Sequence, residues 1–162
     1  MKRIIFTTLL VLLFLVKGNA QINNFDNLVE ISKLNVEQMQ SELENTWKLK
    51  LPIRTVTENN SETKHYIFEF NNGYKKQIIR KSGRFQYEKN KTFWLTDFQF
   101  NDEELLNTIK KNLLEKGFEL VTDEKNRCVY ENAKMAMAII IRTKNSDNVE
   151  KTVEFYEIRI VN

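Results

Sequence analysis

The sequence predicts an α+β protein built from two successive units, each a helix followed by an antiparallel run of strands. Three observations indicate this fold. A helix-starting pattern occurs twice, strand-like segments follow each predicted helix, and turn-forming residues separate those segments. The connections are too short for parallel crossovers, so we expect antiparallel sheet with the helices packed on one face. The first unit covers residues 21–100 and the second covers residues 101–162.

Residues 1–20 have the pattern of an export signal. Lys2 and Arg3 precede an apolar run without acids, and Gly18 and Ala20 stand at the small-residue positions of a cleavage site. The run is shorter than the roughly 20 apolar residues that a membrane-spanning helix needs. We therefore expect cleavage near Ala20, export to the periplasm or the extracellular space, and a mature chain without a transmembrane segment.

Cleavage changes the charge of the protein. The full chain carries 25 Lys and Arg side chains against 22 Asp and Glu, and three of the bases, Lys2, Arg3 and Lys17, lie in the signal. The mature chain is therefore formally neutral. Its overall charge gives no reason to expect a nucleic-acid partner.

The first unit opens with a predicted helix after Leu34. Asn35 is a good N-cap, and Gln38 stands where its side chain can reach back to complete a capping box. Met39, Leu43 and Trp47 then follow at helical spacing and share one face. This face should pack on the sheet.

Four strand-like segments follow this helix, and the register of one hairpin can be predicted. A three-residue loop ending at Gly73 pairs Phe70 with Tyr74, whereas a two-residue turn there would place Phe70 opposite Lys75. The first choice keeps aromatic side chains together on one face, so we expect it. The segments are LKLPIRTV (49–56), HYIFEF (65–70), YKKQIIRK (74–81) and RFQYE (84–88), with a turn at Ser82-Gly83 between the last two.

The second unit repeats this order. Asn101 is the expected N-cap of its helix, Glu104 reaches back to it, and Gly117 is the expected C-terminal glycine. Two arrangements of the whole chain fit the pattern: two lobes with separate sheets, or one continuous sheet. The strand-like segments of this unit are FELVT (118–122), RCVYE (127–131), MAMAIIIRT (135–143) and VEFYEIRIV (153–161).

Two features of the sequence resemble those of a known class of proteins. The signal ends in Asn19-Ala20-Gln21, and the order of a helix followed by an antiparallel meander occurs twice. The chain resembles small exported Bacteroidetes-type proteins of unknown function with tandem helix-plus-antiparallel-meander repeats. The resemblance covers most of the mature chain, rests on no diagnostic motif and transfers no functional residue. It implies an exported α+β protein.

The sequence contains no recognisable catalytic or metal-binding motif. His65 is the only histidine and Cys128 the only cysteine, and both lie inside predicted strands, where nothing activates a thiol. We interpret Cys128 as a structural residue. We expect no cofactor, no metal and no catalytic residue. The leading hypothesis is an exported, non-enzymatic binding protein, and the alternative is a small exported hydrolase with an unrecognised carboxylate site.

One local feature departs from the neutral background. The stretch from Lys75 to Lys91 holds seven basic residues and one acid, and Phe93 and Trp94 follow it. Lysines at a strand edge commonly serve only to prevent unwanted pairing. The functional alternative is a surface for an anionic protein, glycan or lipid headgroup. On the register above, three bases of the group face water together, with one aromatic anchor beside them. The candidate contact residues are Lys75, Lys81, Arg84 and Trp94.

Overall fold

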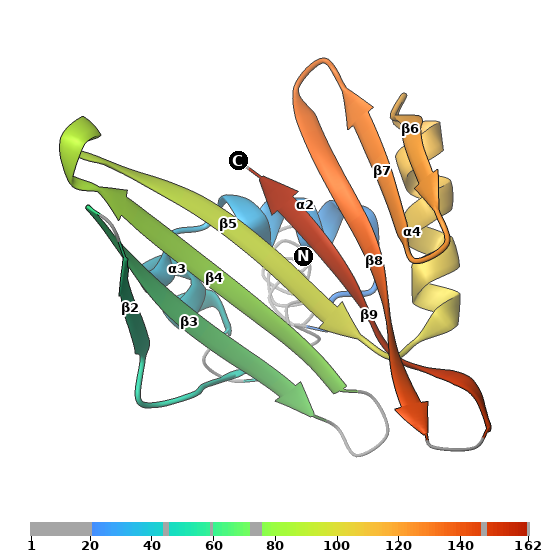
Figure 1. Cartoon of the computed structure of the whole chain (residues 1–162), viewed down its shortest axis with the longest axis horizontal. Coiled ribbons are helices and arrows are strands. Elements are labelled where there is room, and N and C mark those ends of the chain that lie inside the picture. The colour runs from blue at the N-terminus through green and yellow to red at the C-terminus, as the bar shows by residue number, and fades with distance from the viewer. Residues whose placement is uncertain (1–20, 44–45, 59, 72–75, 147–148, 162) are drawn as a thin grey trace, which may run out of the picture.

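The computed structural model describes residues 21–43, 46–58, 60–71, 76–146 and 149–161. Over these residues the chain forms three α-helices and one antiparallel sheet of nine strands (Figure 1), which confirms the predicted α+β class. The helices are α2 (Phe25–Lys33), α3 (Val36–Leu43) and α4 (Glu103–Glu115). The strands are β1 (Lys48–Leu49), β2 (Arg54–Glu58), β3 (Ser61–Asn71), β4 (Lys76–Gln86), β5 (Lys91–Phe100), β6 (Glu119–Glu124), β7 (Arg127–Asn132), β8 (Met135–Ser146) and β9 (Val149–Val161). A short 3-10 helix, Tyr87–Lys89, connects β4 to β5.

The sheet is continuous, which decides between the two arrangements that the sequence left open. The strand order is β1-β3-β4-β5-β9-β8-β7-β6, and β2 pairs with the other part of β3. The last strand of each half, β5 and β9, pair with each other and so join the two halves. As a result the C-terminal strand lies in the middle of the sheet.

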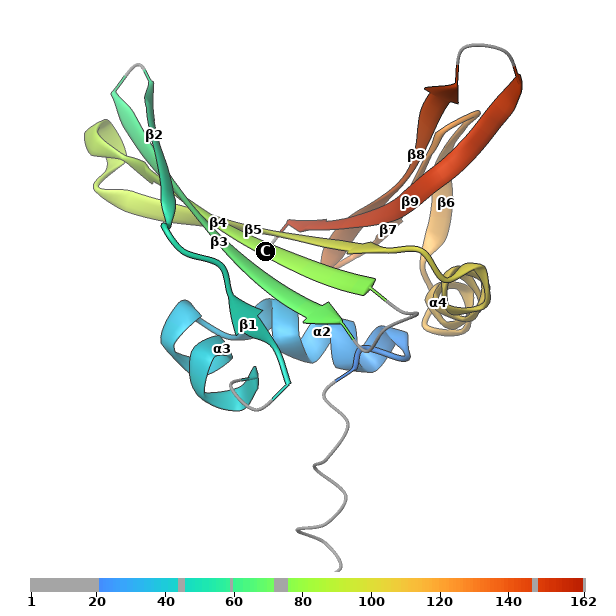
Figure 2. The same ribbon diagram turned by 90° about the horizontal axis from the view of Figure 1, so that it is seen from below.

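The sheet is strongly curved, and its two faces have different surroundings. Figure 2 shows α2 and α3 against the convex side of the strands, with α4 beside the β6–β9 half. Apolar residues of all three helices join the core beneath the sheet. No described helix lies over the concave side, which we call the open face.

A row of apolar side chains crosses the covered face. Phe68, Ile79, Phe98, Ile158 and Ile139 are paired in register across β3, β4, β5, β9 and β8. Each is at most 1% exposed. Because side chains alternate along a strand, the residues between them point to the open face. This alternation fixes which residues can form a site there.

The two predicted helix starts have different outcomes. The amide of Gln38 donates to the Asn35 side chain and the amide of Asn35 donates to the Gln38 side chain, so the capping box is confirmed. In α4 the cap is Asp102, which accepts from the amide of Leu105, so the prediction of Asn101 is wrong by one residue. A carboxylate at this position gains from the positive end of the helix dipole as well as from the hydrogen bond.

The end of α4 follows the prediction. Gly117 has a φ of +75°, which a glycine adopts without strain. Its amide donates to Leu114, and the amide of Phe118 donates to Leu113. These two bonds satisfy carbonyl groups that the helix end would otherwise leave without partners.

Three strand predictions need correction. Phe70 pairs with Gln77, so the predicted pairing of Phe70 with Tyr74 is wrong; Tyr74 itself lies outside the described residues. The predicted turn at Ser82-Gly83 is also wrong, because β4 runs through it without a break. A Cβ at Gly83 would lie 2.7 Å from the Trp94 ring, so this glycine makes room for an indole and does not mark a turn. The segment LKLPIRTV forms parts of β1 and β2, which are separated around Pro52.

Two elements were not predicted at all. Helix α2 begins at an Asn24 cap whose side chain accepts from the Asn27 amide, within a stretch that reads as turn-forming. Strand β5 carries Asp97, a residue type that is uncommon in strands. Both elements are held by tertiary packing.

Candidate functional site

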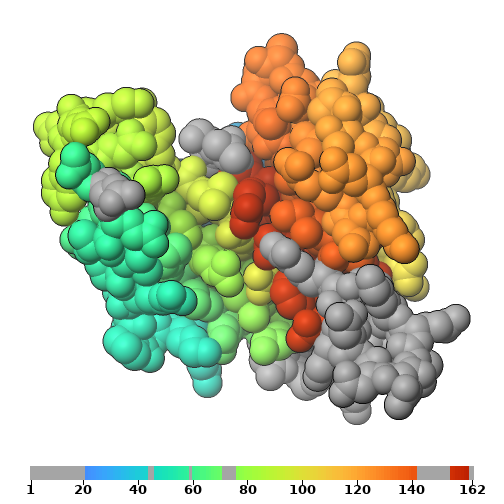
Figure 3. Space-filling model, in the orientation of Figure 1, coloured from blue at the N-terminus to red at the C-terminus, as the bar shows by residue number. Residues whose placement is uncertain are grey.

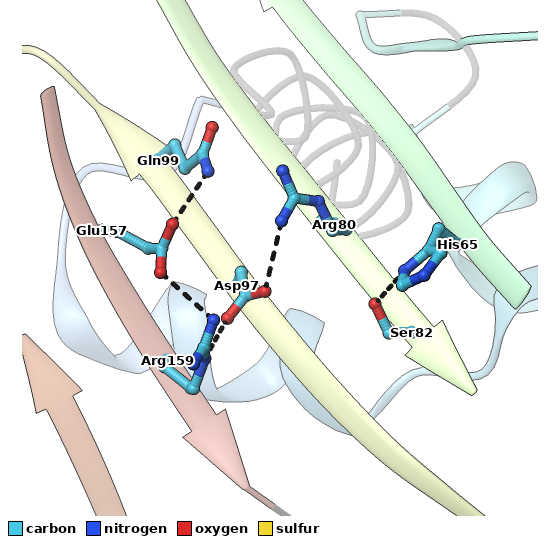
Figure 4. A network of polar contacts seen from close by, with 7 residues as sticks. All are labelled: His65, Arg80, Ser82, Asp97, Gln99, Glu157 and Arg159. Atoms are coloured by element: carbon cyan, nitrogen blue, oxygen red, sulfur yellow. Dashed lines mark hydrogen bonds and ion pairs between the residues drawn. The ribbon is translucent and has the colours of Figure 1, made fainter. Parts of the chain in front are cut away.

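Charged side chains cross the middle of the open face. Arg80 in β4, Asp97 in β5 and Arg159 in β9 occupy directly paired positions in three adjacent strands. Figure 4 shows the three side chains pointing toward one another from these strands. An acid therefore lies between two bases, as favourable cross-strand pairing requires.

The two contacts of Asp97 differ in closeness. Arg159 Nε donates to Asp97 Oδ1 at 2.7 Å, whereas Arg80 Nη1 lies 3.8 Å from Oδ2. The Asp97 side chain is only 2% exposed, while those of Arg80 and Arg159 are 36% and 38% exposed. The carboxylate is thus buried beneath two partly exposed guanidinium groups.

A second buried carboxylate extends the network along β9. Glu157 Oε1 accepts from Arg159 Nη2 at 3.3 Å, and Glu157 Oε2 accepts from Gln99 Nε2 at 2.9 Å. Its side chain is 4% exposed. The hydrogen bond to Asp97 raises the pKa of Arg159, the charges of Asp97 and Glu157 raise it further, and burial opposes this rise. These contacts fix the orientation of the Arg159 side chain.

His65 lies beside the network in β3. Its Nδ1 is 2.9 Å from the hydroxyl oxygen of Ser82, the residue opposite it in β4 (Figure 4). Burial lowers the pKa of His65, and the positive charges of Arg80 and Arg54 lower it further, while Asp97 acts in the opposite direction. The imidazole is therefore neutral at pH 7, when the arginines around it are charged.

The shape of the open face matches this distribution of charge. Figure 3 shows it from the front, recessed between the β3–β5 part in green and the β7–β8 part in orange. A partner that enters the recess meets the exposed parts of Arg80 and Arg159 before the carboxylates beneath them. The arrangement can bind an anion, and its guanidinium groups are already held in position by the ion pairs.

The structure separates the three predicted contact residues that it describes, Lys81, Arg84 and Trp94. Arg84 is exposed on the open face, where its Nε donates to the Ser61 hydroxyl at 3.2 Å. Lys81 is 2% exposed on the covered face, so the prediction that it faces water beside Arg84 is wrong. The two residues stand three positions apart in one continuous strand and therefore point to opposite faces. Trp94 lies on the covered face with Lys81. Lys75 lies outside the described residues.

Arg84 also belongs to a pocket where β3 begins and β4 leads into the 3-10 helix. The pocket has a volume of about 520 Å³. Lys89 adds a second positive charge and Glu88 one negative charge to its lining. This end of the open face therefore carries a net positive charge. The centre of the face likewise exposes arginines to a partner, because its carboxylates are buried.

Sequence reasoning missed the central network. Asp97 lies in an unpredicted strand, and its bond to Arg159 joins residues 62 positions apart, so no local spacing reveals it. One signal was available: Glu157 and Arg159 alternate with isoleucines in a strand-like run, which places the two opposite charges on the same face.

We also considered a metal site, a reactive thiol and a membrane-spanning helix. Among the described residues, no group of three or more His, Cys, Asp or Glu could hold a metal ion. Cys128 is half-buried and its thiol donates to Asp123 at 3.3 Å. Burial and this hydrogen bond raise the pKa of the Cys128 thiol, which reduces its reactivity. Within the described part of the chain, no helix has the length and apolar character needed to cross a membrane.

Comparison with known proteins gave no match to a protein-family model, a curated protein or a solved structure. The resemblance to exported Bacteroidetes-type proteins stays a prediction.

Proposed function

We propose that the chain is an exported, non-enzymatic binding protein whose open face receives an anionic segment of a partner protein. One observation carries the proposal. The acids of the central network are 2% and 4% exposed, whereas the arginines that pair with them are more than one-third exposed. A face whose charges cancel within the fold thus presents guanidinium groups to a partner.

The surroundings of the network favour a protein over the other anionic partners. A flat bilayer surface cannot reach the bottom of a concave face. Half-buried aliphatic side chains such as Ile67, Ile78 and Ile140 lie between the charged positions. Arginine combined with apolar area is typical of protein interfaces.

The contact group of this proposal differs from the one the sequence predicted. Arg84 is kept, and Arg54, Arg80 and Arg159 join it, because strand pairing places all four on the open face. Phe93 on the same face is 40% exposed and is the proposed apolar anchor. A contact by Lys75 stays a prediction.

The proposal includes two expectations from the sequence. We infer export from the signal-like residues 1–20. We also infer that the chain contains a tandem repeat. Helices α3 and α4 each precede an antiparallel run of strands, and the two runs meet at β5 and β9. Under this inference the open face is a single surface to which both halves contribute.

The alternative function, a small exported hydrolase, has its nearest candidates in Asp97 and Glu157. Both carboxylates accept hydrogen bonds from Arg159, and Glu157 accepts another from Gln99. Oxygens engaged in this way are suited to orienting a guanidinium group. Proton transfer to a substrate would first require those bonds to break. The geometry therefore favours binding.

The proposal is tested with charge reversal on the open face. The mature chain is immobilised and exposed to an oligoglutamate peptide, a sulfated oligosaccharide and vesicles that contain an anionic lipid. We expect the peptide to be retained, and its retention to fall as salt rises from about 0.05 to about 0.5 M. The double variant Arg54→Glu/Arg84→Glu should lose at least tenfold in affinity.

Lys111→Glu is the matched control, because this side chain is 76% exposed and belongs to α4, a helix that does not lie over the concave side of the sheet (Figure 2). It should bind the peptide as the wild type does. Equal binding by the double variant and the wild type would overturn the proposal. Retention of the oligosaccharide or the vesicles alone would assign the face to a different partner class.

A further inference from the structure

A second pocket lies on the covered face, where the connection between α2 and α3 meets β4 and β5. Its volume is about 400 Å³, which is within the range of roughly 300–1,000 Å³ typical of small-molecule sites. It is separate from the open face, because Lys81 and Trp94 point to the opposite side of the sheet from Arg80 and Arg84. The lining residues are Ser32, Lys33, Leu34, Asn35, Lys81 and Trp94.

The polar group that distinguishes this pocket is the ammonium of Lys81. The residue is 2% exposed, and its Nζ donates to the backbone carbonyl of Ser32. Among the lining residues that the structure describes none is acidic, and no ion pair with a described carboxylate reaches Lys81. Burial lowers the pKa of Lys81 to about 8. A buried ammonium with three donors and no counter-ion is costly for the fold.

Trp94 provides an apolar wall beside this charge. Lys81 Nζ lies 5.9 Å from the centre of its ring. The indole occupies the space that a side chain at position 83 would need, since a Cβ on Gly83 would come within 2.8 Å of two ring atoms. Leu34 adds aliphatic surface. The pocket thus combines one buried cation with a fixed aromatic surface.

A second buried polar group, the Thr96 hydroxyl, lies close to Lys81. Thr96 stands directly opposite Lys81 in β5, on the same face of the sheet. Its hydroxyl is buried and, among the described residues, has no hydrogen-bond partner. Buried polar groups in folded proteins normally have one. Lys81 and Thr96, which are paired across β4 and β5, therefore both have hydrogen-bonding capacity that the described residues do not fill.

We propose that this pocket binds a small organic carboxylate with a planar apolar body. The carboxylate accepts hydrogen bonds from the Lys81 ammonium and supplies the counter-ion that the described fold does not. The apolar body lies against Trp94 and Leu34. Of the two lysines in the lining, Lys33 is exposed and only Lys81 is buried. A single buried ammonium suits a monoanion better than a phosphate, which carries more charge and more acceptors.

The test compares two probes of the same shape, 3-phenylpropionate and its neutral amide, 3-phenylpropionamide. Binding to the mature chain is followed by the NMR shift of the Trp94 indole N–H. We expect the carboxylate to bind at least tenfold more tightly than the amide at pH 7. In Lys81→Met this preference should disappear, whereas Lys111→Gln, an exposed change in α4 outside both proposed sites, should keep it.

The pH dependence of the wild type gives a second measurement that needs no variant. Above pH 8 the free Lys81 loses its proton, so the affinity for the carboxylate should fall about tenfold per pH unit. A site made of arginines would show no such fall, because guanidinium groups stay charged. The proposal is overturned if the Trp94 signal does not respond, if the amide binds as tightly as the acid, or if the affinity is constant from pH 7 to pH 10.

Discussion

The two faces of the sheet bury charge in opposite ways. On the open face, Asp97 and Glu157 are buried together with arginine donors from adjacent or the same strands. On the covered face, Lys81 is buried with a carbonyl oxygen as its hydrogen-bond partner. Both faces belong to the same strands, so the difference lies in the side chains and not in the backbone that presents them.

The carboxylates of the open face are stabilised by arginine partners, whereas the Lys81 ammonium of the covered face has no described counter-ion. A buried ion pair with good geometry largely offsets its own desolvation, and it fixes the orientation of its members. A buried ammonium without a counter-ion lowers the stability of the folded state. We therefore expect the protein to lose stability when Arg159 of the open-face network is replaced, and to gain stability when the buried Lys81 of the covered face is replaced by an apolar residue.

The largest effect should follow from removing the shared donor of the open face. Arg159→Met leaves Asp97 buried with only the looser contact to Arg80, and it takes one donor from Glu157. We expect a loss of about 3–5 kcal/mol in the free energy of unfolding, measured by urea denaturation.

A double variant is the control for this result. Adding Asp97→Asn to Arg159→Met removes the stranded charge, so it should recover part of the lost stability. If the double variant is less stable than Arg159→Met by the full effect of Asp97→Asn alone, the two residues are not coupled, and the open face is not held by this pair.

The next largest effect should be a gain of stability at Lys81. The pKa of this lysine is about 8 in the folded protein and 10.5 in its ordinary state, so burial of the ammonium opposes folding at pH 7. The shift corresponds to a gain of about 3 kcal/mol for Lys81→Met at neutral pH, less what the lost hydrogen bond contributed.

The sign of this effect depends on pH in a defined way. Between pH 8 and pH 10.5 the unfolded wild-type chain binds a proton at Lys81 that the folded chain has lost, so wild-type stability rises with pH. The advantage of Lys81→Met should shrink over this range. A variant that is less stable than the wild type at pH 7 would mean that Lys81 is not an uncompensated charge.

A smaller effect should appear at Gly83, where the covered face is close-packed. Gly83→Ala forces the new methyl group against the Trp94 ring at 2.7 Å, so we expect a loss of about 1–3 kcal/mol. The neighbouring residue Ser82 points to the open face. Ser82→Ala removes the contact with His65 and should lower the free energy of unfolding by about 1 kcal/mol. Equal tolerance of both substitutions in thermal unfolding would contradict the observed packing.

The parts of the fold that could be predicted depend on short-range order. The capping box of Asn35 and Gln38 and the C-terminal glycine of α4 act within a few residues, so the sequence displays them directly. The turn assigned to Gly83 failed because a glycine has two uses, and the local sequence does not distinguish a turn from room for a distant indole. Strand β5 was missed because Asp97 makes it look unlike a strand until the partner of this carboxylate is known.

The candidate site was less predictable than the fold. Local composition predicted a contact group that included Lys81, Arg84 and Trp94. The observed hairpin register and the unbroken strand β4 place these residues on two different faces. The strands that hold Asp97 and Arg159 become neighbours only when two distant segments of the chain pair in the middle of the sheet. Long-range pairing of this kind leaves no periodic signal in a single sequence.

The smallest effect should be found at His65, at the edge of the open-face network. Burial and the nearby charges of Arg80 and Arg54 hold its pKa below the ordinary 6.5. The unfolded chain therefore takes up a proton at His65 before the folded chain does. The contribution of His65 to stability is full above pH 6.5 and is lost as the pH falls through the folded pKa. His65→Gln, which can keep a hydrogen bond to Ser82, should change stability at pH 7 by less than about 1 kcal/mol.

The informative measurement is the slope of stability against pH. Urea unfolding of His65→Gln should depend less on pH below 6.5 than unfolding of the wild type, and NMR titration should place the wild-type imidazole pKa below 6.5. A pKa at or above 6.5 would mean that Asp97 outweighs the two arginines at this position. His65 would then be partly protonated near neutral pH, and it would add positive charge beside β3 to that of Arg54 and Arg80.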